Sequence, residues 1–227
     1  MSLFLNRQSA GKILAEKLAR EKLIDPLVLA IPRGGVVVGA EIARALGADL
    51  DVFVAKKIGA PGNSELAIGA VGPDGVAIIN HALAYQTGAD ERYLQTEIKN
   101  LGLEVKERIK KFRRKKPKLA VKDKTVILVD DGIATGATVE VAIKWLRQKG
   151  AKTIVLAVPV APPETIEKMT PLVEKIICLY RPSFFAAVGQ FYEEFPQISD
   201  EEVLNMLDDE TENKGQKVKI KKSPVIK

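Results

Sequence analysis

The chain contains 227 residues, 46% of them hydrophobic, and carries a formal net charge of +6. A chain of this length can bury a sizeable core and most simply forms one domain. Its single cysteine, Cys178, and single histidine, His81, exclude an intrachain disulfide and a His/Cys metal cluster. No run approaches the roughly 18 apolar residues of a membrane-spanning helix, and the N-terminus lacks the pattern of a signal peptide. We therefore expect a cytoplasmic globular protein with no membrane association.

The first part of the sequence alternates between helix and strand patterns. Apolar residues at helical spacing predict an amphipathic helix over residues 9–18. The unbroken apolar run 27–31 predicts a strand that is buried on both faces, as in a parallel sheet. A Pro-Arg-Gly-Gly turn (32–35) follows directly and leads into a predicted helix over 36–46 that Gly47 ends. Two glycines beside a guanidinium group suit the binding of an anion.

The next part predicts a strand, an irregular segment and a hairpin. Residues 51–55 have the strand pattern, whereas glycine and proline between 59 and 62 predict that 56–65 lacks regular structure. Residues 66–71 and 76–79 are expected to pair across a Gly-Pro-Asp-Gly turn. The lysines at the start of the irregular segment are candidates for contact with an anion.

A basic segment follows a long amphipathic helix predicted over 91–109. From 104 to 124 there are eleven Lys/Arg residues against three acids, with Pro117 marking the end of the connector. Such a segment either forms a solvated face that steers anionic substrates or contacts nucleic acid. Phe112 is its one aromatic residue, so base stacking has little support and the first interpretation is favoured.

The segment 125–138 carries the main functional signal. The run 125–129, in which every residue is β-branched or apolar, predicts a central strand of a parallel sheet. Two carboxylates, Asp130 and Asp131, follow where that strand would leave its sheet, and a turn with two glycines leads to Thr138, near the predicted N-cap of a helix. Free N–H groups at a helix N-terminus bind phosphate. Phosphate would repel the acids, so their partners are hydroxyl groups or a hydrated metal ion, and the segment suits a ribose 5-phosphate.

The rest of the chain continues the alternation of strands and helices. The pattern throughout predicts an α/β fold with a doubly wound, mostly parallel sheet flanked by helices, and ligands of such folds lie at the carboxyl ends of the strands. One domain is expected over 1–207, and the polar, charged residues 208–227 are expected to form a disordered tail. The remaining predicted elements are strands at 153–158 (broken by Pro159) and 175–179, and helices at 164–169 and 200–207.

The run 126–138 resembles the phosphoribosyl-pyrophosphate (PRPP) signature of type I phosphoribosyltransferases, and the turn 32–35 resembles their pyrophosphate-binding loop. In that family the two acids hold the ribose hydroxyl groups, and a flexible loop closes over PRPP. The resemblance implies catalytic roles for Asp130, Asp131 and Lys57. It implies 5-phosphate binding by Ile133, Ala134, Thr135, Gly136, Ala137 and Thr138. It implies pyrophosphate binding by Arg33, Gly34, Gly35 and Lys56.

The acceptor is less defined than the PRPP site. Five of the chain's aromatic residues fall in 180–192, and they are either the part of a small C-terminal hood (about 180–200) that stacks on the acceptor or ordinary satellite core. Under the first reading Tyr180, Phe191 and Tyr192 contact the acceptor. Ala134 stands where hypoxanthine–guanine members carry an acid and orotate members a hydroxyl residue, which argues against a 6-oxopurine.

The reaction that the resemblance implies is displacement of pyrophosphate from ribose C1 by a nitrogenous base. Mg²⁺ is the expected cofactor, bound through PRPP with no direct protein ligand, although water molecules would bridge it to the two acids. The expected partners are PRPP, a small-molecule acceptor and, as in other members, a second copy of the chain. Two alternatives stay open: a non-catalytic PRPP-binding regulator or nucleic-acid-binding protein, and a phosphoribosyl hydrolase.

Overall fold

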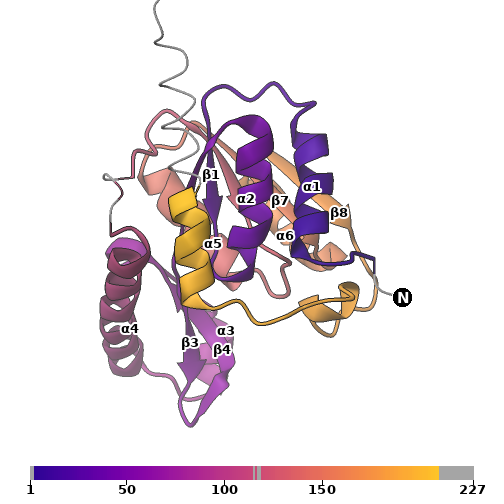
Figure 1. Ribbon diagram of the computed structural model, residues 1–227. Coiled ribbons are helices and arrows are strands. Elements are labelled where there is room, and N and C mark those ends of the chain that lie inside the picture. The colour runs from indigo at the N-terminus through magenta and orange to yellow at the C-terminus, as the bar shows by residue number, and fades with distance from the viewer. Residues whose placement is uncertain (1–2, 115, 117–118, 210–227) are drawn as a thin grey trace, which may run out of the picture.

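A five-stranded parallel sheet forms the centre of the protein (Figure 1). The computed structural model describes residues 3–114, 116 and 119–209. The strand order is β2-β1-β6-β7-β8, and every neighbouring pair is parallel, which confirms the predicted α/β class. The strands are β1 (Pro26–Ala30), β2 (Asp49–Val52), β6 (Thr125–Val129), β7 (Thr153–Val160) and β8 (Lys175–Tyr180).

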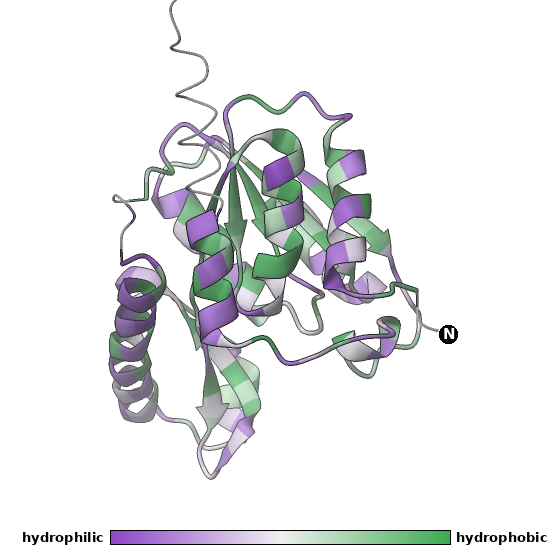
Figure 2. Ribbon diagram, viewed as in Figure 1, coloured by the Kyte–Doolittle hydropathy of each residue, from purple (hydrophilic) through white to green (hydrophobic). Residues whose placement is uncertain are grey.

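Helices cover both faces of this sheet. Successive residues of a strand point to opposite faces, so Leu27 and Val28 enter two different cores. Every residue of β6 is buried, which is why its sequence contains only β-branched and apolar residues. The strands of the central sheet are mostly hydrophobic (Figure 2). One core contains residues of α1 (Arg7–Leu18), α2 (Gly34–Leu46) and a helix over 200–209, and the other contains residues of α5 (Ala137–Gln148) and α6 (Pro163–Met169).

A small antiparallel sheet lies beside the parallel one and packs against a long helix, α4 (Figure 1). Its strand order is β3-β4-β5, and Ala70 pairs with Ile78, which confirms the predicted hairpin between 66–71 and 76–79. Polar residues dominate the outer surface of α4 (Figure 2). The elements are β3 (Lys56–Ala60), β4 (Asn63–Val71), η1 (Pro73–Gly75), β5 (Ala77–Ile79), α3 (His81–Gln86) and α4 (Glu91–Phe112).

The prediction that 56–65 lacks regular structure was wrong, because these residues form β3 and the start of β4. Their glycines make the hairpin tight instead of irregular. A Cβ atom on Gly59 would lie 2.7 Å from the Cα of Ser64, so only glycine allows this approach of the two strands. Gly62 has a φ of 72°, the left-handed conformation that a short turn requires.

Two predicted strand boundaries were also wrong. The strand expected over 51–55 is β2, because its pairing with β1 ends where Ala30 meets Val52. The strand expected to break at Pro159 continues to Val160, because β8 pairs with β7 on both sides of the proline. The final helix continues to residue 209, beyond its predicted end at 207. From residue 210 the predicted tail lies outside the described residues, as does Pro117.

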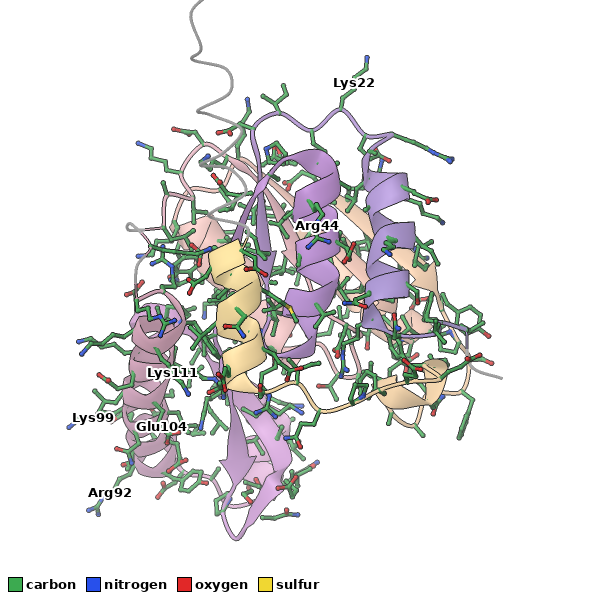
Figure 3. All side chains as sticks on the ribbon, viewed as in Figure 1. Lys22, Arg44, Arg92, Lys99, Glu104 and Lys111 are labelled. Carbon is green, nitrogen blue, oxygen red and sulfur yellow. The ribbon has the colours of Figure 1, made fainter. Side chains whose placement is uncertain are left out.

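Ion pairs hold much of the basic segment in place. Its first half forms the last turns of α4, where Arg108 and Lys111 donate to Asp200 (Figure 3 shows Lys111 directed to the helix over 200–209). Arg113 then binds both carboxylate oxygens of Asp51 in β2, at 2.9 and 3.1 Å. These cations therefore fasten α4 to the edge of the parallel sheet. Within the described residues, no helix combines the length and apolar character needed to cross a membrane.

Candidate active site

The two turns singled out in the sequence meet at one edge of the parallel sheet. β1 and β6 are neighbours that end together, at Ala30 and Val129. The turns that follow them are in direct contact. A Cβ atom placed on Gly34 would lie 1.8 Å from Oδ2 of Asp131. The structure thus brings the predicted pyrophosphate turn onto the predicted ribose-binding acids, although the two are far apart in the sequence.

Substituting Gly34 with alanine should therefore disturb both turns at once. Asp131 cannot move aside without leaving its ion pair with Arg7, so we expect a loss of about 1–3 kcal/mol in the free energy of unfolding, as for other overpacked sites. If this turn binds pyrophosphate, as the resemblance implies, PRPP affinity measured by calorimetry should also fall about tenfold. Gly102→Ala is the matched control, because a Cβ atom there meets no heavy atom within 4 Å; it should stabilise α4 by about 0.5–1 kcal/mol. Equal behaviour of the two variants would contradict the close contact.

The two aspartates differ in their surroundings. The Asp131 amide donates to Oδ1 of Asp130 at 2.8 Å, and the Asp131 carboxylate binds Nε of Arg7 at 2.6 Å. Burial raises the pKa of Asp130 well above its usual range, and the negative charge of Asp131 raises it further. Asp131 therefore has a permanent positive partner, whereas Asp130 carries an electrostatic cost that a bound cation or a pair of hydroxyl donors would relieve.

Arg7 is a site residue that the sequence interpretation missed. It is the first residue of α1, after the N-cap Asn6 that forms a capping box with Ser9, and its side chain is 9% exposed. Nη1 donates to the carbonyl oxygen of Pro196 at 2.8 Å, and the guanidinium lies 3.6 Å from the ring centre of Phe195. A cation in the first turn of a helix opposes the helix dipole. That unfavourable placement was the signal in the sequence that could have identified Arg7.

The predicted phosphate turn leaves a series of amides free. Gly136 is the N-cap of α5 with a φ of 78°, and Thr138 lies in the first turn, close to the N-cap as predicted. A Cβ atom on Gly136 would lie 2.8 Å from Cε of Met169. Within the described part of the chain, the amides of 134–138 donate no hydrogen bond. The amide of Ile133, by contrast, donates to the carbonyl oxygen of Val160, so Ile133 fixes the turn to β7 and its amide is not free for a phosphate.

A cleft of about 580 Å³ adjoins this turn. Ala134 and Thr135 form one side of it, and Thr165 and Lys168 of α6 form another. The hydroxyl group of Thr165 donates to the carbonyl oxygen of Ala134 at 2.5 Å, which fixes the turn against α6. The exposed backbone of 134 and 135 is therefore held in place by protein contacts before any ligand binds.

The three predicted cations lie in different environments. Arg33 precedes α2, is about one-third exposed, and has Nη1 4.0 Å from Oδ1 of Asp200. Lys56 forms an ion pair with Glu104 of α4, and Lys57 is exposed on β3. The structure thus places Arg33 beside the glycine turn, whereas both lysines lie on the small antiparallel sheet.

Asp200 is a second residue that the sequence interpretation missed. The hydrogen bond from Lys111 and the charges of Arg108 and Arg33 hold its pKa below the usual range. A lowered pKa adds stability that is present above the unfolded-state pKa of about 3.9 and is lost as the pH falls through the lower folded-state value.

Asp200→Asn should therefore lower the free energy of unfolding by about 1–2 kcal/mol at pH 7. The difference from the unsubstituted protein should shrink as the pH falls below about 4. Urea unfolding between pH 7 and pH 3 measures both effects. The control is Glu201→Gln, an exposed carboxylate on the same helix, which should change stability by no more than about 0.5 kcal/mol. A constant difference across this pH range would contradict the assigned ion pairs.

The predicted acceptor residues separate into two groups. Tyr192 is buried, and its hydroxyl group donates to the carbonyl oxygen of Asp131 at 2.5 Å. Its ring lies 5.4 Å from that of Phe4, so the N-terminal segment packs against Tyr192 close to Asp131. Phe191 is buried in the same apolar cluster as Tyr192, and its ring centre lies 6.0 Å from that of Tyr180. Tyr180 and Phe191 also line a cleft of about 470 Å³. Tyr192 is therefore placed to support Asp131, and the other two to border a cleft.

The fold and this site define a doubly wound α/β domain with a carboxylate pair between two glycine turns at one sheet edge. Its sequence matches the phosphoribosyl transferase domain over residues 5–194, and the chain belongs to that family, as the motifs indicated. The solved structure of TT1426 from Thermus thermophilus is 44% identical, with a TM-score of 0.78, and the match covers 92% of this chain and 99% of that one.

A curated relative extends the comparison. "Putative phosphoribosyl transferase Rv0571c" of Mycobacterium tuberculosis (strain ATCC 25618 / H37Rv) is 40% identical over 208 residues, which are 92% of this chain and 47% of the relative. The chain thus spans about half the length of that protein.

Proposed function

We propose that this chain is a PRPP-dependent phosphoribosyltransferase. The observation that carries the proposal is the contact between the Gly34–Gly35 turn and Asp130–Asp131, beside a turn with free amides. A ligand with a sugar diol between two separate phosphate groups matches this order of acids and anion-binding turns. PRPP has that constitution, with a 5-phosphate at one end and a pyrophosphate on C1.

Each part of the site has a role in this proposal. The amides of 134–138 hold the 5-phosphate, favoured by the dipole of α5. Asp130 and Asp131 hold the ribose hydroxyl groups, and Arg33 with the glycines after it holds the pyrophosphate as it leaves. Displacement at C1 passes through an oxocarbenium-like transition state. The chain's contribution is to fix the sugar, to stabilise the leaving group and to exclude water.

Mg²⁺ fits the donor set of this site. Among the described residues there is no group of three or more acids, cysteines or histidines for a metal, and Mg²⁺ commonly binds through only one or two carboxylates together with phosphate oxygens and water. Asp130, whose carboxyl group carries an electrostatic cost, is the residue we expect to face the ion. When bound, Mg²⁺ would neutralise the charge that develops on pyrophosphate. Lys56 and Lys57 would have to move with the β3–β4 hairpin to add to that effect.

The acceptor is proposed only as a nitrogenous base. Ala134 has no group that moves a proton, so the turn itself offers no general acid or base for a 6-oxopurine. Tyr180 and Phe191 border a cleft that a planar ring could enter. Since Cys178 is the only cysteine, we also propose a reducing, cytoplasmic setting.

Release of pyrophosphate from PRPP and Mg²⁺, measured against a panel of pyrimidine, purine and other heterocyclic bases, tests this function. Base-dependent release supports a transferase, and base-independent release would replace it with a hydrolase. Tight PRPP binding without turnover would instead support a regulator. An Asp131→Asn variant with unchanged PRPP affinity would contradict the role of the carboxylates. Salt-dependent DNA binding is the test for the nucleic-acid alternative, although many cations of the basic segment already have protein partners.

A further inference from the structure

A cavity of about 920 Å³ lies between α4, η1 and the end of α5. Its volume is within the range of small-molecule sites, roughly 300–1,000 Å³. None of the residues assigned to PRPP or to the acceptor lines it. The cavity is therefore separate from the site described above, and nothing in the proposed reaction accounts for it.

Aromatic and aliphatic side chains form its interior. Phe53 and Trp145 lie with their ring centres 5.6 Å apart, and Ile98 of α4 and Leu119 also line the cavity. The indole nitrogen of Trp145 donates to Asp74 at 3.0 Å. The one polar atom of that side chain is thus satisfied, and Trp145 offers the cavity apolar surface. Such an interior favours a flat apolar group.

Charged side chains also line the cavity, among them Asp74, its ion-pair partner Lys149, and Arg113, which is paired with Asp51. Lys99, Lys106 and Lys122 all line the cavity, and within the described residues none of the three has an ion pair or a hydrogen bond. Their neighbours differ, because Arg108 and Lys111 are bound to Asp200. Figure 3 shows Lys99 extending from α4 into solvent. The positive charges of these three lysines are thus available to a ligand from outside the chain.

Gly102 marks a place in the cavity wall where a larger side chain would enter the cavity. It lies in the interior of the 22-residue helix α4, where glycine is destabilising relative to alanine. A Cβ atom there would meet no heavy atom within 4 Å, and its φ is not in the left-handed region. Neither close packing nor backbone conformation therefore requires glycine at this position. What the glycine does is leave space in the wall of the cavity, which it lines.

We propose that this cavity is an accessory site for a small aromatic anion. The planar body would lie against Phe53 and Trp145, and a phosphate or carboxylate group would be held by the three lysines. The apolar interior binds the aromatic half of such a molecule, and the unpaired cations bind its anionic half. A neutral aromatic compound or an inorganic anion would satisfy only one half.

Fluorescence titration of the full chain with 8-anilinonaphthalene-1-sulfonate, an aromatic anion, tests this proposal. We expect one binding site, with affinity reduced about tenfold or more by Gly102→Leu, which places a bulky side chain in the cavity, and by Lys99→Glu combined with Lys106→Glu. The matched control is Lys110→Glu, an exposed lysine on the same helix that does not line the cavity, and it should bind as the unsubstituted chain does. Circular dichroism shows whether each variant is folded. If Gly102→Leu does not fold, the variant with both lysines replaced tests the site alone.

Two further arms define the ligand class. N-phenyl-1-naphthylamine, which lacks the sulfonate, should bind about tenfold more weakly than the anionic probe. Displacement of the probe by a nucleoside monophosphate or by an aryl carboxylate identifies the anionic group that the site takes, and displacement by neither would count against the proposal. Unchanged probe affinity in both cavity variants, or equal affinity for the neutral compound, would overturn it. None of these measurements uses PRPP. Their outcome therefore tests the accessory site independently of the proposed reaction.

Discussion

Replacing Arg7 with alanine is expected to lower the free energy of unfolding by about 3–5 kcal/mol, the cost of leaving one member of a buried ion pair alone. The Asp131 carboxylate is 15% exposed and has Arg7 as its charged partner at 2.6 Å. Removing the guanidinium also removes the contact with Pro196 and the stacking on Phe195. For a chain of this size, the melting temperature should fall by about 10 °C.

The design of this test separates charge from packing. Arg7→Lys keeps the charge but loses the planar contact on Phe195, so an intermediate loss is expected. Arg20→Ala removes an exposed arginine just beyond α1 and should change stability by no more than about 0.5 kcal/mol. In the double variant Arg7→Ala with Asp131→Asn, no unpaired charge is left, so the two losses should not add. Additive losses would show that Arg7 and Asp131 do not act as a pair.

Asp130→Asn is expected to make the protein more stable and nearly inactive. The folded state raises the pKa of Asp130, chiefly through burial and then through the charge of Asp131. A raised pKa means that the folded protein binds the proton more tightly than the unfolded chain does. The stability that this group contributes is therefore complete below about pH 3.9 and is lost as the pH rises through the folded-state value. An amide in its place does not ionise, so the variant should exceed the unsubstituted protein in melting temperature at pH 7.

The same substitution should lower kcat/KM for PRPP by about 100-fold, because the proposed function has this carboxylate accept hydrogen bonds from the ribose hydroxyl groups. Thermal unfolding at pH 5 and pH 8, together with pyrophosphate release, measures both effects. The stability gain should be larger at pH 8. Glu16→Gln, an exposed carboxylate on α1, is the control and should alter neither quantity. A destabilised Asp130→Asn variant, or one with full activity, would contradict the assignment of this residue.

Local sequence was sufficient for most of the fold and for the centre of the candidate site. Both glycine turns follow runs of apolar or β-branched residues, which is the pattern of a strand buried on two faces. The prediction failed in 56–65, where glycines were taken as a sign of irregularity. There Gly59 allows two strands to approach closely, and Gly62 adopts the left-handed conformation of the turn between them. Whether glycines mark a tight hairpin or an irregular segment depends on the partner strand.

The sequence by itself determined the α/β class, the two turns and the acids of the candidate site, because each depends on neighbours that are close in the chain. Only the tertiary structure decided which distant residues complete them. Arg7 meets Asp131 across 124 positions and Tyr192 meets it across 61, contacts that follow from the strand order and from how the N-terminal segment pairs with the hood. The cavity beneath α4 likewise joins residues from separate segments of the chain. Local patterns specify which side chains are buried, but the packing of whole elements specifies their partners.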